Sequence, residues 1–257
     1  MRTLLAVVVL LAAAAPAPAP TEAPEKLFAA GQQAHAAEDY EKAMELFEQA
    51  TAAAPDVSRY HLWYGRACGM RADRIGMFGG FGLARKTLAA FRKAAEVDPA
   101  NVEALNDLLE YYVAAPGIVG GGVEKAVPIA ERLATISPPE GHRAQARILS
   151  KQKDWQGAER EYRKALALEP EKPGRMLDLA SFLARRDRRQ EADEWFDRAA
   201  RLSPDSPDYL WARGSELARS KRNPQLARDL LERYLKASRK PDDPPASEAR
   251  ELLKKLG

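Results

Sequence analysis

The sequence predicts an all-α protein, an α-solenoid of about six stacked helical hairpins, and three observations lead to this prediction. Apolar residues in the stretch DWQGAEREYRKALALEP recur with the period of one helix face: Trp155, Ala158, Tyr162, Ala165 and Leu166. The pattern of a small residue, an aromatic residue, a small residue and a proline returns 34 residues after Ala158, at Ala192, Phe196, Ala199 and Pro204. Similar sets occur along most of the 257 residues. Such a period indicates a repeat array in which each hairpin buries its apolar stripe against the next.

This spacing resembles the second helix of a tetratricopeptide repeat, whose period is about 34 residues. The resemblance covers most of the chain. It implies a right-handed superhelix of helical hairpins whose concave groove binds a protein or peptide. A non-enzymatic scaffold is therefore the expected function, and no cofactor is expected.

Residues 1–20 are interpreted as a signal peptide with a Pro/Ala-rich start. Arg2 precedes the apolar run LLAVVVLLAAAA, which has the length of a secretory signal and is too short to span a bilayer. A transmembrane anchor is the alternative. The sequence thus predicts an exported bacterial protein, periplasmic or secreted, with no stable membrane anchor after cleavage of the signal.

The repeat array is expected over residues 21–240. Repeat one fits Leu27 to Ala34 and Tyr40 to Pro55. Repeats two and three have the same residue sets, but their second helices come about ten and about five residues late against the family period. The excess lies in 73–82 (DRIGMFGGFG) and 115–122 (APGIVGGG), which are predicted to be loops projecting on the same edge of the array.

Repeats four and five follow the regular period. In repeat six the second helix is displaced by one residue, past Asn223 and Pro224. Residues 241–257 then form a Pro-rich break, PDDPP, and an amphipathic helix from Ala246 to Leu256. We expect this helix to cap the last apolar surface, because arrays need a polar outer face at their ends.

Composition argues against several function classes. The 40 Lys and Arg against 37 Asp and Glu give a net charge of +3, which describes a mixed surface and not a nucleic-acid-binding one. The three histidines are scattered without metal-ligand spacing, and no nucleophile and base can be paired. The single Cys68 is expected to be buried and inert. The sequence indicates neither an enzyme nor an oligomeric state.

The glycine-rich stretch GMFGGFG does not match a phosphate-binding loop, because it has no preceding strand and lacks the lysine and Ser/Thr of a P-loop. We expect the apolar residues of the two loops either to pack on neighbouring helices or to contact a partner. The proposed loop contacts are Phe78, Phe81 and Ile118. A second possible function is a periplasmic small-ligand-binding or transporter-associated component with a cavity under these loops.

The family resemblance also implies which residues line the groove, because in tetratricopeptide repeats the first helices form it. The positions that match are Arg66, Arg143, Arg147, Lys151, Arg185, Trp211 and Arg219. This set predicts a partner with acidic or carboxylate groups and Trp211 as an apolar anchor. The alternative is a merely solvated face, neutralised by carboxylates such as Glu140 or Asp208. The carboxylate clamp that binds chaperone tails elsewhere in the family is missing.

Overall fold

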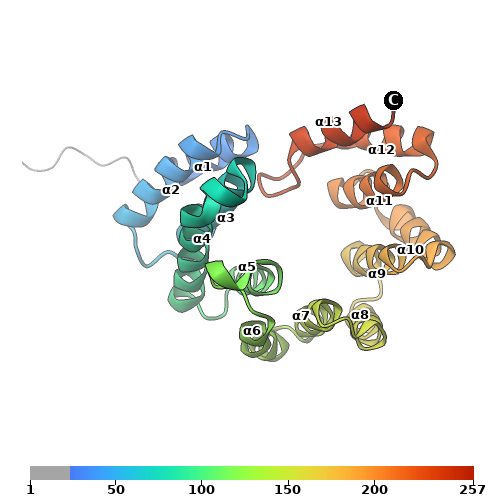
Figure 1. Ribbon diagram of the computed structural model, residues 1–257, viewed down its shortest axis with the longest axis horizontal. Helices are drawn as coiled ribbons and strands as arrows, with labels where there is room; N and C mark the ends of the chain where they lie inside the picture. Colours follow the sequence, from blue (N-terminus) through green and yellow to red (C-terminus); the bar gives the residue numbers. More distant parts are fainter. Residues whose placement is uncertain (1–23) are drawn as a thin grey trace, which may run out of the picture.

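The computed structural model describes residues 24–257, and its regular elements in this range are all helical (Figure 1). The expected signal peptide, residues 1–20, lies outside the described residues. Within the described range no helix is both long enough and apolar enough to cross a bilayer.

The six expected hairpins are present, each made of two consecutive helices. They are α1 (Pro24–Ala36) with α2 (Tyr40–Ala53), α3 (Ser58–Ile75) with α4 (Met77–Val97), α5 (Val102–Ala114) with α6 (Val123–Ile136), α7 (Pro138–Lys151) with α8 (Trp155–Leu168), α9 (Pro173–Arg185) with α10 (Arg189–Leu202), and α11 (Pro207–Ser220) with α12 (Pro224–Lys236). The expected capping helix is α13 (Ala246–Lys255), which packs against α11 and α12.

Three hairpin turns share a residue in the left-handed backbone conformation, placed two positions after the end of the first helix. Glu38, Lys153 and Asp187 each take the left-handed conformation, with φ of 62°, 66° and 61°. This conformation ends a helix and reverses the chain within a few residues. In two of these turns the next residue is an aspartate, Asp39 or Asp154, whose side chain accepts a hydrogen bond from the first turn of the second helix.

The hairpins follow one another around a ring that is almost closed (Figure 1). Helices α3, α5, α7, α9 and α11 lie on the inner side, and α4, α6, α8, α10 and α12 lie on the outer side. The segment that precedes the last helix, α13, returns to α1 and α3. The concave surface of the array is therefore the inside of this ring.

In the first two hairpins the aromatic residue of the second helix fills the space beside a glycine of the first helix, as the spacing predicts. Phe47 and Phe196 are fully buried. A Cβ atom added to Gly31 would lie 2.6 Å from the Phe47 ring, and one added to Gly65 would lie 2.6 Å from Phe91. Glycine is required at these positions because the two helices approach so closely.

The expectation of a long loop at residues 73–82 was wrong. Helix α3 continues to Ile75, α4 begins at Met77, and only Gly76, with φ of 80°, separates them. The extra residues lengthen two helices because the neighbouring glycines permit contact: a Cβ on Gly80 would lie 2.8 Å from the backbone oxygen of Ala72. Phe78 and Phe81 are therefore helical residues of α4; the side chain of Phe81 is half-buried, and that of Phe78 lies outside what the structure describes.

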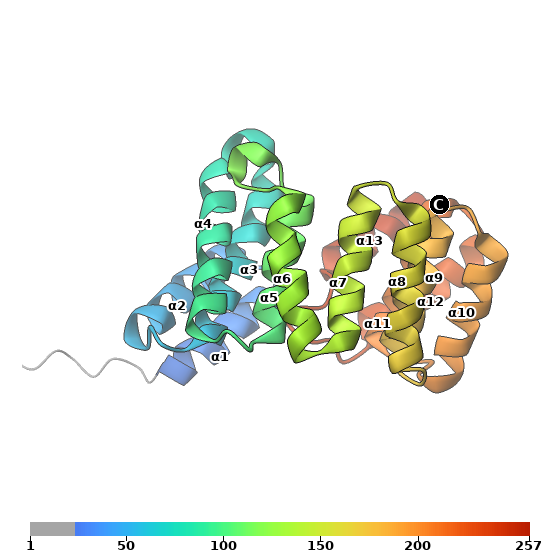
Figure 2. The ribbon, with the colours of Figure 1, turned by 90° about the horizontal axis from the view of Figure 1, so that it is seen from below.

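Residues 115–122 do form a connecting segment, which contains the short 3₁₀ helix η1 (Gly117–Val119). Figure 2 shows η1 at the same edge of the array as the α3–α4 turn, in agreement with the prediction. The hydroxyl of Tyr111 lies 2.8 Å from the carbonyl oxygen of Ala84 and 2.9 Å from that of Val119, which ties the segment to α4. Ile118 is 68% exposed at the tip.

Candidate functional site

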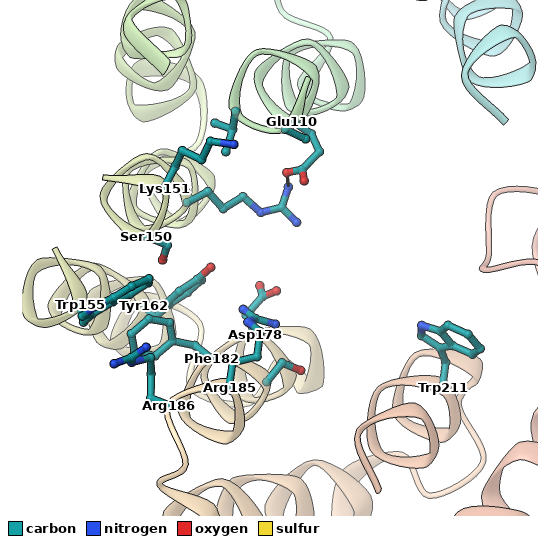
Figure 3. A pocket seen from close by; sticks show the side chains of 14 residues that line it. Glu110, Ser150, Lys151, Trp155, Tyr162, Asp178, Phe182, Arg185, Arg186 and Trp211 are labelled. Carbon is teal, nitrogen blue, oxygen red and sulfur yellow. Dashed lines mark hydrogen bonds and ion pairs between the residues drawn. The ribbon is translucent and has the colours of Figure 1, made fainter. Parts of the chain in front are cut away.

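A cavity of about 860 Å³ opens on the inner side of the ring, between the first helices of repeats three to six (Figure 3). We call it the inner cavity. Helices α5, α7, α8, α9 and α11 contribute to its wall. Its charged and aromatic lining residues are Glu110, Arg147, Lys151, Trp155, Tyr162, Asp178, Phe182, Arg185, Arg186 and Trp211.

Three cations at the inner cavity have no carboxylate partner within salt-bridge distance among residues 24–257. They are Lys151, at the end of α7, and Arg185 and Arg186, at the end of α9. All three side chains are exposed. The guanidinium carbon of Arg186 lies 4.2 Å from the centre of the Trp155 ring, so the indole holds this cation by a cation–π contact.

Arg147 and Arg143, from the same helix, are neutralised by carboxylates. Arg147 pairs with Glu110 on α5 at 2.5 Å. Arg143 pairs with Glu140 at 2.9 Å and with Asp178 at 3.0 Å. These two arginines tie α7 to its neighbours and carry less free charge than the sequence suggested.

The Glu140 carboxylate links α7 to α9. It also accepts a hydrogen bond from the buried Arg175, at 2.5 Å. Burial alone would raise the pKa of Glu140, but the hydrogen bonds and charges of Arg175 and Arg143 outweigh burial and lower its pKa to about 2. Glu140 is therefore ionised at neutral pH, and its carboxylate is already paired with two arginines of the chain.

Trp211 lies on α11, across the cavity from the other labelled side chains (Figure 3). Its ring is half-buried and packs against the Tyr234 ring, with the ring centres 5.3 Å apart and the planes tilted by 44°. Arg219, two turns further along α11, is exposed and pairs with Glu248 of α13 at 2.7 Å. Arg219 is not among the residues that line the inner cavity.

Arg66 lies at a second cavity, of about 700 Å³, bounded by α3, α4, α5 and the 115–119 segment. Its guanidinium is shared by three carboxylates: Asp107 at 2.6 Å, Asp242 at 3.4 Å and Glu103 at 3.6 Å. The structure thus separates Arg66 from the other residues of the predicted set.

Four of the seven groove residues inferred from the sequence line the inner cavity together: Arg147, Lys151, Arg185 and Trp211. Arg186 and Trp155 also line it and were not predicted. The family frame assigns only first helices to the groove, whereas Trp155 is the first residue of a second helix and Arg186 follows the end of a first helix. An indole next to a cation-rich turn was the signal that could have revealed them.

The three histidines do not meet. His35 is buried near α3, His142 lies 2.6 Å from Glu161, and His61 lies 2.8 Å from the carbonyl oxygen of Pro55. Within the part of the chain that is described, no group of three or more His, Cys, Asp and Glu side chains is arranged to hold a metal ion. Cys68 is buried, as expected, and burial raises the pKa of its thiol to about 11.

Comparison with protein families gives two matches, at residues 28–68 and 149–213, and both are to the tetratricopeptide repeat. They agree with the hairpins, the period and the buried aromatic residues described above. The chain is a tetratricopeptide repeat protein. No curated protein matches it.

Solved structures with the same fold include two bacterial proteins. TTC0263, a thermophilic tetratricopeptide repeat protein of Thermus thermophilus, has a TM-score of 0.58 at 22% identity; the match covers 76% of this chain and 99% of that one. PilF of Pseudomonas aeruginosa has a TM-score of 0.51 at 15% identity, with coverage of 84% and 91%. At these identities the similarity supports the fold of this tetratricopeptide repeat protein and nothing finer.

Proposed function

We propose that this protein is a non-enzymatic scaffold that binds an acidic segment of a protein partner in the inner cavity. The observation that carries the proposal is the charge of the lining: Arg147, Lys151, Arg185 and Arg186 face only two carboxylates, Glu110 and Asp178. Both carboxylates already pair with arginines of α7, so Lys151, Arg185 and Arg186 are left for a ligand.

The two indoles give the site its second property. Trp155 and Trp211 lie at opposite sides of the cavity and are each half-buried (Figure 3). Tryptophan is common at interface centres because its large ring buries apolar area and loses little conformational entropy. A segment with Asp or Glu beside an apolar residue matches this arrangement, because charge-assisted hydrogen bonds to arginine add to the apolar contact.

The proposal can be tested with a printed array of acidic peptides in which apolar residues are interspersed. We expect the wild-type chain to bind a subset, with binding weakened at high salt because exposed charges are screened. The variant Lys151→Glu with Arg185→Glu should lose about tenfold or more in affinity, because two of the three free cations are reversed. Arg147 is a poorer choice for reversal because Glu110 already neutralises it.

The matched control is Arg201→Glu with Lys236→Glu. It makes the same change in net charge at exposed positions of the outer helices α10 and α12. Equal binding by both double variants would contradict a site at the inner cavity.

We propose a second candidate function, binding of a small molecule, because of the second cavity. It lies under the 115–119 segment and has a largely apolar lining that includes Met70, Phe91 and Val119. Native mass spectrometry of protein purified without denaturation tests this. A bound molecule should add a discrete mass, and its loss on unfolding should follow; a spectrum of the bare chain alone contradicts the second candidate.

We also propose that the scaffold is exported to the bacterial envelope. The support is the amino-terminal pattern of Arg2 and the apolar run that follows it. Cell fractionation with amino-terminal sequencing of the recovered protein is the test. A mature protein that begins between residues 13 and 20 is expected, and a cytoplasmic protein that retains Met1 contradicts export.

A further inference from the structure

The segment that joins α12 to α13, residues 237–245, returns to the first two repeats, and we call it the strap. His35 Nδ1 on α1 lies 2.8 Å from the carbonyl oxygen of Pro241, 206 positions away in sequence. Asp242 pairs with Arg66 on α3 at 3.4 Å. These contacts join the two ends of the array across the gap in the ring (Figure 1).

The next contact is between Glu38 and the start of α13. The backbone N–H of Ser247 donates to Glu38 Oε1 at 2.9 Å. The residue before α13 is Pro245, which supplies no capping side chain, so the first-turn N–H groups of this helix have no cap of their own. Glu38, from the α1–α2 turn, provides a carboxylate at the positive end of the helix dipole. Arg74 holds the Glu38 side chain in place.

The strap is also stiff. Three prolines fix the backbone φ angle at Pro241, Pro244 and Pro245. The backbone N–H of Lys240 donates to Asp243 at 2.6 Å, and the Tyr234 hydroxyl donates to the carbonyl oxygen of Pro244. A segment held in its bound shape loses little entropy on docking.

The attachment of the strap to repeats one and two is nevertheless weak. The single charge of Arg66 is shared among Asp242, Asp107 and Glu103, so Asp242 gains only part of it. Pro241 contributes one hydrogen bond, and Asp242 is exposed. Partly exposed ion pairs contribute little to stability. The strap is therefore docked in a defined way by contacts that a competitor can replace.

We propose that the strap is an intramolecular ligand of repeats one and two. It holds the array closed as a ring, together with the contact of Glu38 with α13, and a partner's acidic, proline-containing segment opens the ring by taking the place of the strap on His35 and Arg66. This surface is distinct from the inner cavity, and the proposal does not depend on acidic peptides binding there.

The first test measures closure in the full chain with nitroxide labels at Gln49→Cys and Lys255→Cys, two exposed positions on α2 and α13. The native Cys68 is buried and stays unlabelled. We expect one narrow distance distribution in the otherwise wild-type chain. With Glu38→Gln and Asp242→Arg the distribution should become broader and longer. Circular dichroism should show that helix content is kept.

The control for closure is Asp205→Arg with Glu131→Gln, which changes the same charges at exposed positions away from the strap. It should leave the narrow distribution unchanged. Identical distributions in the wild-type chain and the Glu38→Gln, Asp242→Arg variant overturn the proposal.

The second test supplies the strap in trans, as a fluorescent peptide of residues 237–247. The Asp242→Arg chain, whose own strap is disabled but whose docking residues are intact, should bind the peptide about tenfold or more tightly than the wild-type chain, in which the site is occupied. A peptide that carries Asp242→Arg should bind neither chain. Equal affinities of the natural peptide for the two chains also overturn the proposal.

Discussion

In repeats four to six the buried side chains form one cluster that runs from Ala146 on α7 to Leu252 on α13, whereas those of repeats one to three form two clusters. One of these two surrounds α1, α2 and one face of α3, and the other extends from Leu62 on α3 to Ile148 on α7. The division falls in the second hairpin, whose helices are lengthened. Repeats four to six thus share one core, while the lengthened second hairpin divides the core of repeats one to three.

The two regions also differ in how their cations are paired with carboxylates. At the second repeat Arg66 is shared by three carboxylates, one of them from the strap. At the fourth and fifth repeats Lys151 and Arg185 have no carboxylate within ion-pair distance in the described chain. The amino-terminal region pairs its cation with carboxylates of its own chain, and the carboxy-terminal region has two cations without such a pair among the described residues.

The largest expected effect comes from removing a buried aromatic residue. Phe196→Ala should lower the free energy of unfolding by about 3–5 kcal/mol, because it leaves a cavity in the continuous core. In urea unfolding with hydrogen exchange, Phe196→Ala should speed exchange from α8 to α12, and Phe47→Ala only in α1 to α3. Equal spread of the two effects would contradict the divided core.

A smaller effect is expected from Glu140→Gln, about 2–3 kcal/mol at neutral pH. The folded-state pKa of Glu140, about 2, lies below its ordinary value of 4.5. Its carboxylate therefore stabilises the fold above pH 4.5, and this contribution is lost as the pH falls from 4.5 towards 2. Urea unfolding across this range should show the wild-type and variant curves converging, while the exposed Glu131→Gln control follows the wild type throughout.

Close helix approach should make one glycine less replaceable than another. An added Cβ lies 2.6 Å from Phe91 at Gly65, but 3.2 Å from Leu230 and Leu231 at Gly214. Alanine gains about 1 kcal/mol of helix propensity at either site, and overpacking costs about 1–3 kcal/mol. Gly65→Ala should therefore destabilise the protein and Gly214→Ala should be near neutral in thermal unfolding. The reverse order would show that the fourth-to-sixth-repeat region packs more tightly.

The smallest expected effect is the pH response of His35. Burial lowers its pKa below 6.5, and Nε2 has no hydrogen-bond partner in the described chain. As the pH falls through 6.5, the unfolded chain takes up the proton before the folded chain does, so stability should decline. Thermal unfolding between about pH 7.5 and 5 should show this slope in the wild type and a flatter one in His35→Gln. The charges of Asp242 and Arg66 also act on the His35 imidazole and shift its pKa, so both residues must stay unchanged in this comparison.

The sequence predicted the fold well where local pattern decides structure. The spacing around Tyr162 and Phe196 recurs because both aromatic residues are buried on the inward face of the second helix of their hairpin. The pattern failed at residues 73–82, where glycines suggest a loop but instead allow α3 and α4 to touch. That contact forms only when the two helices lie side by side, and the local sequence pattern does not show their arrangement.

The candidate site was predicted in part for a related reason. The positions of Lys151 and Arg185 along their helices predicted correctly that they lie on the inner face. The position of a residue in a helix sets the direction in which its side chain points. It could not say that Arg147 would meet Glu110 from another repeat, or that Asp242 would return to Arg66 across 176 positions. Partners so distant in sequence follow from the curvature of the whole array, which no single repeat encodes.

The strap also has a consequence for the order of folding. Contacts in the array join neighbouring hairpins, so its repeats can form as they leave the ribosome. The contact of Glu38 with Ser247 spans 209 positions and requires both ends of the chain. Ring closure is thus expected to be the last step, since the entropy of such a long loop must be lost before the contact forms. If the strap is the ligand proposed above, every newly made molecule passes through an open array in which a partner segment meets no competitor.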